Sequence, residues 1–184
     1  MPIPVLIAYA TRSGSTLEVA EAIGAALEDA GAAATVLPVA QVSTLSDYTS
    51  VILGGPLYIG RFPKEFRNFI RSQREGLERC QPWCFVLGPT RNETKDFDAA
   101  RTQALKQLSR YPWLHPVELK VFGGRWSMAS VPFPFSLVRR IPGNPLGKIP
   151  AQDIRDWGAI REWAQGIARQ LEPAAQECHP TPVG

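Results

Sequence analysis

The stretch from Val5 to Glu18 places the strongest constraint on how this chain of 184 residues can fold. An apolar run ends at Ala10 and is followed by a hydroxyl-rich loop around Gly14, after which the spacing becomes helical. Uninterrupted apolar character predicts a buried strand of a parallel sheet. A strand, loop and helix in this order direct backbone N–H groups and the positive end of a helix dipole at one point in space. The loop therefore predicts a phosphate site that comprises Thr11, Arg12, Ser13, Gly14, Ser15 and Thr16.

Segments with strand character alternate with segments of helical spacing along the chain. Strands are expected at 3–9, 33–39, 51–55, 83–87 and 117–122, and helices at 16–30, 63–79, 95–109 and 156–171. This alternation predicts an α/β fold with a doubly wound, five-stranded parallel sheet between two layers of helices. A chain of this length suits one domain, here residues 1–171, followed by a frayed tail at 172–184.

Three of the helices begin with recognisable signals. Ser15 and Glu18 have the spacing of a capping box at the start of the first helix. Pro63 suits the first position of the second helix, since its missing N–H has no intrahelical partner there. Asp156 is placed to cap the last helix.

Two further loops are expected beside the phosphate loop. The carboxyl ends of parallel strands lie at one edge of a sheet, and ligands of such folds bind there. The loops at 10–16, 55–62 and 88–94 follow the first, third and fourth strands and should meet at that edge. Their candidate binding residues are Pro56, Leu57, Tyr58, Ile59 and Gly60 in the second loop and Gly88, Pro89, Thr90 and Arg91 in the third.

The spacing of the phosphate loop excludes the common nucleotide-binding motifs. It has neither the G-x-x-x-x-G-K-[ST] pattern of a P-loop nor the G-x-G-x-x-G pattern of a dinucleotide site. The second strand does not end in an acidic residue that could hold a ribose. A response regulator would need acidic residues just after the first strand, where this chain has Ala8, Tyr9 and Ala10. A mononucleotide phosphate, held by hydroxyl and backbone N–H groups, remains.

Cysteine and histidine usage argues against a metal centre. Cys80, Cys84 and Cys178 lack metal-site spacing, and their odd number favours a reduced, cytoplasmic setting. His115 and His179 are far apart, so neither a histidine metal site nor a catalytic triad is expected. The sequence has no run near the roughly 20 apolar residues of a membrane span, and its N-terminus does not resemble a signal peptide.

The segment 124–150, between the fifth strand and the last helix, is too long for an ordinary connection. It is rich in aromatic and apolar residues, and between Leu119 and Gln152 the sequence contains five cations but no acidic residue. This composition suits peripheral contact with a membrane surface or with an acidic apolar substrate. Trp126 either borders a ligand or packs within the insert, and Arg139 and Arg140 either contact a partner or are solvated. No nucleic-acid partner is expected.

The loop Thr11-Arg12-Ser13-Gly14-Ser15-Thr16 resembles the FMN phosphate-binding signature of flavodoxins. A closer resemblance, covering the chain to about residue 171, is to the flavodoxin-domain branch that contains menaquinone-dependent protoporphyrinogen oxidase. Its hallmarks here are Gly54-Gly55-Pro56-Leu57-Tyr58-Ile59-Gly60-Arg61, Val121-Phe122-Gly123-Gly124, the long insert and Asp153-Ile154-Arg155-Asp156-Trp157. The second loop departs from the branch pattern, which weakens the inference of a porphyrinogen more than that of FMN.

The resemblance implies a flavodoxin-like fold that binds FMN noncovalently and transfers electrons. It implies an oxidoreductase acting on a bulky quinone or porphyrinogen, with the insert as the wall that faces the substrate. In that setting Arg91 either stabilises reduced flavin or is solvated. A soluble electron carrier that docks on a redox partner is the main alternative, although flavodoxin carriers are typically acidic around the flavin. A flavodoxin-like domain without flavin is a third hypothesis.

Overall fold

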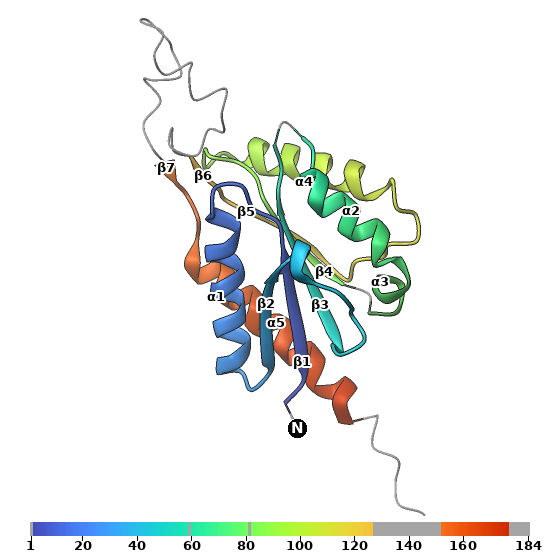
Figure 1. Ribbon diagram of the computed structural model, residues 1–184. Coiled ribbons are helices and arrows are strands. Elements are labelled where there is room, and N and C mark those ends of the chain that lie inside the picture. Colours follow the sequence, from blue (N-terminus) through green and yellow to red (C-terminus); the bar gives the residue numbers. More distant parts are fainter. Residues whose placement is uncertain (1, 59, 81, 127–151, 177–184) are drawn as a thin grey trace, which may run out of the picture.

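A five-stranded parallel sheet forms the centre of the molecule. The computed structural model describes residues 2–58, 60–80, 82–126 and 152–176 (Figure 1). The strands are β1 (Pro4–Tyr9), β2 (Ala33–Pro38), β3 (Ser50–Pro56), β4 (Trp83–Leu87) and β5 (Leu119–Phe122), in the order β2-β1-β3-β4-β5. The direction in which the sheet grows reverses between β1 and β3, and this reversal confirms the doubly wound sheet predicted from the sequence.

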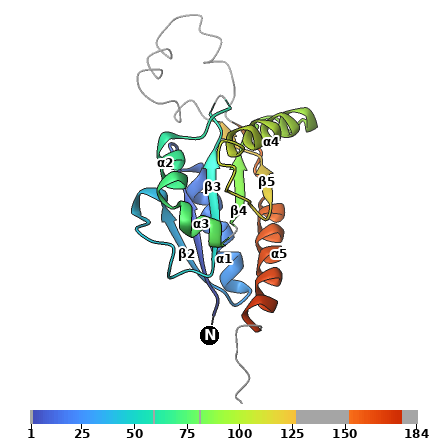
Figure 2. The same ribbon diagram turned by 90° about the vertical axis from the view of Figure 1, so that its right-hand side faces the viewer.

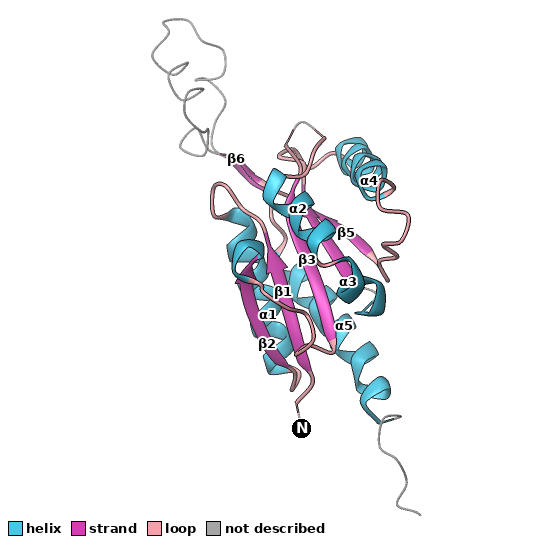
Figure 3. Cartoon of the chain, turned by 45° about the vertical axis from the view of Figure 1, so that its right-hand side comes forward, coloured by secondary structure: helices cyan, strands magenta, loops and turns pink. Residues whose placement is uncertain are grey.

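Helices cover both faces of the sheet. The helices α1 (Ser15–Asp29) and α5 (Trp157–Gln176) share one buried apolar cluster with one face. The helices α2 (Lys64–Ser72) and α4 (Thr94–Leu108) contribute to a second cluster on the opposite face, as does α3 (Arg74–Cys80). A short 3₁₀ helix, η1 (Val39–Gln41), follows β2. Figure 3 shows the two layers in front of and behind the strands, and in Figure 2 α5 runs along the side opposite to α2 and α3.

The segment predicted as one helix over 63–79 forms two helices with a break at Gln73. The side chain of Gln73 donates to the carbonyl oxygen of Ser43 at 3.1 Å, and after the break Gly76 lies against Leu45. A Cβ at position 76 would come within 2.9 Å of the Leu45 side chain. This long-range contact redirects the chain, so helical spacing alone predicts a helix that is too long. Pro63 occupies the cap position, one residue before the position predicted for it.

The ends of α5 are partly as predicted. The Asp156 carboxylate accepts the backbone N–H of Ala159 at 2.9 Å, which confirms the expected cap. The helix continues to Gln176, beyond the predicted end at 171. Proline removes one N–H donor from a helix interior, but here Pro173 does not end the helix. The tail assigned to 172–184 is therefore helical over its first residues, and 177–184 lie outside the described residues.

The two ends of the insert lie side by side. The strands β6 (Arg125–Trp126) and β7 (Gln152–Asp153) pair antiparallel, with Arg125 opposite Asp153. The sequence did not predict this pairing, because each strand is too short to show an apolar pattern. Residues 127–151, which include Arg139 and Arg140, lie outside the described residues. Within the described ranges, none of the helices has the length and apolar character needed to cross a membrane.

Candidate functional site

The loops that follow β1, β3 and β4 begin next to one another at the carboxyl edge of the sheet (Figure 1). Backbone hydrogen bonds extend the strand pairing into these loops. The N–H of Ala10 donates to Gly54 at 2.9 Å, that of Leu57 to Leu87 at 3.0 Å, and that of Gly88 to Phe122 at 3.2 Å. The expected convergence of the three loops is thus a direct consequence of the parallel sheet.

The loop after β1 leaves the first turn of α1 open. Gly14 precedes the helix at φ 83°, a left-handed conformation that favours glycine. Its N–H donates to the hydroxyl oxygen of Thr11 at 3.0 Å, so that hydroxyl holds the loop in shape. The predicted capping box does not form, since Ser15 is already helical and α1 begins without a side-chain cap. The first N–H groups of a helix have no partner within the helix, and here no cap competes for them.

Thr16 contributes a buried oxygen atom that lacks a partner. Its side chain is fully buried, and Oγ1 has no hydrogen-bond partner in the part of the chain that the structure describes. Ser15 beside it is buried as well, while Arg12 is exposed and Ser13 is half-buried. A buried hydroxyl without a partner costs free energy. An anion bound at the start of α1 would satisfy both this hydroxyl and the open N–H groups, so the loop fits a phosphate.

Four charged side chains form a set of ion pairs beside the first turn of α1. The carboxylate of Glu18, in the first turn of α1, lies 2.9 Å from Nη1 of Arg125 and 2.8 Å from Nη1 of Arg155. The Arg155 side chain is only 3% exposed and also contacts the Ser15 carbonyl oxygen at 3.5 Å. Its remaining nitrogen atoms donate to the Asp153 carboxylate, and its guanidinium lies 4.5 Å from the centre of the Trp157 ring. We call Glu18, Arg125, Asp153 and Arg155 the charged quartet; its formal charges cancel.

The quartet changes the acid–base properties of two members. Hydrogen bonds from the Arg155 side chain hold the pKa of Asp153 below its ordinary value, and the same contact raises the pKa of Arg155. A carboxyl group whose pKa is lower in the folded state adds stability above its unfolded pKa. That stability is lost as the pH falls through the folded value.

The free energy of unfolding is therefore expected to fall more steeply in the wild type than in Asp153→Asn as the pH drops below about 4. Asp98→Asn on the exposed side of α4 removes the same charge and serves as the control. Urea unfolding at a series of pH values measures the difference. Equal slopes for wild type and Asp153→Asn would contradict the assigned role of this ion pair.

The second loop is a tight turn. Tyr58 and Arg61 exchange two backbone hydrogen bonds of 3.0 Å each, and Gly60 between them has φ 71°. Tyr58 is 36% exposed, and the Arg12 guanidinium lies 5.2 Å from its ring centre. A cation over an aromatic face is attracted to it, so this contact connects the second loop to the phosphate loop. Pro56 is buried at the end of β3, and Ile59 lies outside the described residues.

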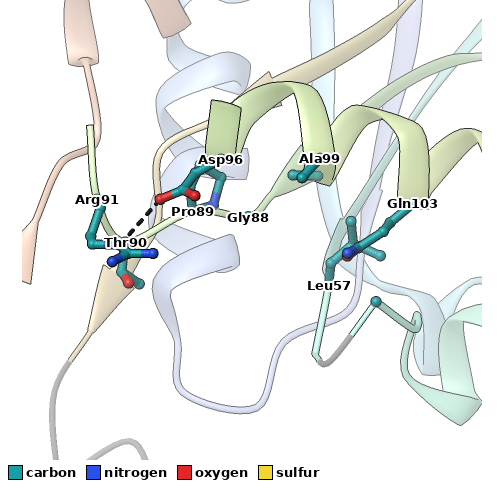
Figure 4. A pocket seen from close by; sticks show the side chains of 10 residues that line it. Leu57, Gly88, Pro89, Thr90, Arg91, Asp96, Ala99 and Gln103 are labelled. Atoms are coloured by element: carbon teal, nitrogen blue, oxygen red, sulfur yellow. Dashed lines mark hydrogen bonds and ion pairs between the residues drawn. The ribbon is translucent and has the colours of Figure 1, made fainter. Parts of the chain in front are cut away.

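A cavity of about 430 Å³ lies between the second and third loops and α4 (Figure 4). It is lined by the predicted residues Leu57, Gly60, Gly88, Pro89, Thr90 and Arg91, and by Asp96, Ala99, Ala100 and Gln103 of α4. Arg91 forms an ion pair with Asp96 at 3.2 Å, and its side chain is 66% exposed. This ion pair holds the Arg91 side chain at the edge of the cavity, and its contact with reduced flavin stays a prediction.

Sequence reasoning missed the contribution of α4 to this cavity. Residues 96, 99, 100 and 103 recur at helical spacing and therefore share one face of α4. The spacing could have been found in the sequence. It indicates a ligand-binding face, however, only when α4 is known to lie beside the third loop. A second cavity of about 420 Å³ lies between residues 91–93 of this loop and residues 152–154 at the base of the insert. Trp126 lies in β6, and its contact with a ligand stays a prediction.

The cysteines within the described ranges are not arranged for metal or redox chemistry. Cys80 and Cys84 are free, and burial raises the pKa of the Cys84 thiol to about 12. A thiol with a raised pKa is a poor nucleophile and a poor metal ligand at neutral pH. Among the described residues, His, Cys, Asp and Glu do not form a group that could hold a metal ion.

Comparisons with known proteins agree with this geometry. A family model described as a flavodoxin domain matches residues 6–133. A cysteine-to-serine variant of a flavodoxin from Pseudomonas aeruginosa is 16% identical, with a TM-score of 0.56 over 92% of this chain and 99% of that chain. A flavodiiron core from Synechocystis is 14% identical, with a TM-score of 0.56 over 94% of this chain and 36% of that chain.

Rubredoxin oxygen:oxidoreductase from Desulfovibrio gigas is 17% identical, with a TM-score of 0.54 over 94% of this chain and 37% of that one. The chain thus spans little more than a third of the flavodiiron core and of this oxidoreductase, and nearly the whole flavodoxin. None of the curated proteins matches the sequence. Because the family match covers more than half of the residues, the chain belongs to the flavodoxin domain family.

Proposed function

We propose that this chain binds FMN, the cofactor of the flavodoxin domain family, and transfers electrons through it. The observation that carries the proposal is the unpartnered, buried Thr16 hydroxyl at the uncapped start of α1. These groups are suited to a phosphate, and among the described residues the Thr16 hydroxyl has no hydrogen-bond partner and α1 has no side-chain cap. When bound, FMN supplies the redox chemistry.

The residues of this edge divide the binding between them. The first turn of α1 and the Thr16 hydroxyl would hold the phosphate, and the Thr11 hydroxyl keeps Gly14 in its left-handed conformation. Leu57, Gly60 and residues 88–91 line the adjoining cavity, which would receive the ring system. Leu57, Pro89 and Ala99 give part of that space an apolar lining.

We further propose an oxidoreductase that acts on a bulky apolar substrate, with a quinone or a porphyrinogen as the class. The charge distribution supports this reading, because residues 119–152 contain five cations but no acidic residue. Such a segment repels the basic patches of protein partners that an acidic carrier would attract. It suits an acidic apolar molecule or an anionic lipid surface, so peripheral membrane contact through the insert is part of the proposal.

A soluble electron carrier is the second candidate. It is favoured by the similarity to the flavodoxin from Pseudomonas aeruginosa. The matched region covers 92% of this chain and 99% of that protein, which is described only as a flavodoxin. The two functions place FMN in the same site and differ in what accepts the electrons. They are therefore separated by substrates and not by cofactor binding.

The first experiment is the absorption spectrum of the purified chain after addition of FMN and removal of the excess. A retained flavin spectrum is expected, and a chain that does not retain FMN would end both redox proposals. The second is turnover of protoporphyrinogen with a quinone acceptor by the FMN-loaded protein, compared with its reduction by a flavodoxin reductase. Turnover of the small molecules supports the enzyme, whereas reduction by the reductase alone supports the carrier.

A further inference from the structure

We propose that Arg125, at the base of the insert, is a positioning residue of the phosphate site that acts by neutralising Glu18. The inference rests on the proposed binding of FMN and goes beyond it, because it gives β6 a part in selecting a phosphorylated flavin. Arg125 was not among the residues that the sequence assigned to the cofactor. The pairing of β6 with β7 holds Arg125 opposite Asp153, beside the phosphate site.

Glu18 poses an electrostatic problem for the phosphate site. It lies in the first turn of α1, whose N–H groups and dipole attract an anion. A carboxylate at this position partly cancels the positive potential of the helix start, and it repels a phosphate dianion. A free Glu18 would therefore weaken the preference for FMN over riboflavin, which lacks the phosphate.

The charged quartet removes this conflict. The Glu18 carboxylate pairs with both arginines: Nη1 of Arg125 lies 2.9 Å from Oε1 and 3.2 Å from Oε2, and Nη1 of Arg155 lies 2.8 Å from Oε2. Arg155 is shared with Asp153 through its other nitrogen atoms, so it cannot neutralise Glu18 fully. Arg125 supplies the missing charge, and with it the four formal charges sum to zero. The positive potential at the start of α1 is then available to attract the phosphate.

The two arginines have separable roles. The Arg155 side chain is buried, contacts the Ser15 carbonyl oxygen and lies on Trp157, so its replacement would disturb packing as well as charge. The Arg125 side chain is 33% exposed and therefore tolerates replacement by a neutral side chain of similar length. Arg125→Gln is for this reason the variant that tests the electrostatic role.

The experiment measures the dissociation constants of FMN and riboflavin for the full chain by quenching of flavin fluorescence. Their ratio reports the phosphate contribution alone, because a general disturbance of the fold weakens both flavins. Arg125→Gln is expected to lower the preference for FMN roughly three- to tenfold and to leave riboflavin binding unchanged. Inorganic phosphate, used as a competitor of FMN, should show a matching rise in its inhibition constant.

The decisive variant is the double replacement Glu18→Gln with Arg125→Gln. It removes both partners of the pair and restores neutrality, so the preference for FMN should return to within about twofold of the wild type. A merely structural role for the pair would not be rescued by removing both side chains. Arg110→Gln, an exposed residue between α4 and β5, removes the same charge far from the loop and should leave the ratio unchanged.

The outcomes separate the inference from the proposed function. An unchanged ratio in Arg125→Gln, a loss that the double variant does not reverse, or an equal loss in Arg110→Gln would each overturn the inference. A wild-type chain that binds neither flavin would overturn the proposed function, and the inference with it.

Discussion

Thr16→Val is expected to weaken FMN binding by roughly one to two orders of magnitude without lowering the stability of the cofactor-free protein. Thr16 Oγ1 is buried and has no partner in the described part of the chain. Valine keeps the branched shape and removes the hydroxyl, so the cofactor-free protein loses a desolvated polar group and gains or keeps stability. In the FMN complex, by contrast, the variant lacks the hydrogen bond from the Thr16 hydroxyl to the charged phosphate. Such a bond is worth about 1.5–3 kcal/mol.

The matched control is Thr11→Val in the same loop. The Thr11 hydroxyl accepts the Gly14 N–H at 3.0 Å, so its loss is expected to weaken both FMN binding and the cofactor-free fold. Fluorescence titration with FMN measures the first property, and urea unfolding without FMN measures the second. If Thr16→Val lowered the free energy of unfolding as Thr11→Val does, the Thr16 hydroxyl would have a partner within the protein, and its assignment to a ligand would be wrong.

A loss of stability of about 3 kcal/mol or more is expected from Gly54→Ala. Gly54 pairs with Phe85 across β3 and β4, and a Cβ at position 54 would lie 2.1 Å from Cζ of the Phe85 ring. The ring cannot move aside, because Phe122 and Trp163 pack around it with ring centres 6.3 Å away. Urea unfolding measures the loss.

Two further variants test that explanation. Gly55→Ala is the neighbouring control, since a Cβ there would meet Phe66 at an ordinary 3.4 Å, and its cost should be much smaller. Phe85→Leu removes the ring that opposes Gly54 and should recover part of the loss in the double variant. Equal costs at positions 54 and 55, or a double variant without recovery, would show that the Phe85 ring is not the reason.

How much of the site could be predicted depended on how far apart its parts lie in the sequence. The phosphate loop is contiguous from Thr11 to Thr16, and strand, loop and helix signals all follow from neighbouring residues. The meeting of the three loops also followed from the sequence, because parallel strands bring their carboxyl ends to one edge. These predictions required patterns along the chain and a general rule of sheet topology.

The capping box shows where local reasoning went wrong. Ser15 and Glu18 have the right spacing, and nothing nearby in the sequence argues against it. In the structure Glu18 binds Arg125 and Arg155, the second of which is 137 residues away. Two cations outcompete one backbone N–H for a carboxylate. The competing partner became visible only when the sheet and α5 brought distant residues to the same helix.

The sequence by itself determined the alternation of strands and helices, the phosphate loop and the family. Each of these follows from contiguous residues or from the periodic spacing of apolar residues. The tertiary structure alone decided that α2 and α3 separate, that α4 lines the cavity beside the third loop, and that Arg125 and Arg155 neutralise Glu18. These features arise from contacts between side chains that are far apart in the chain. Their energies depend on distance and burial, and those exist only once the sheet has formed.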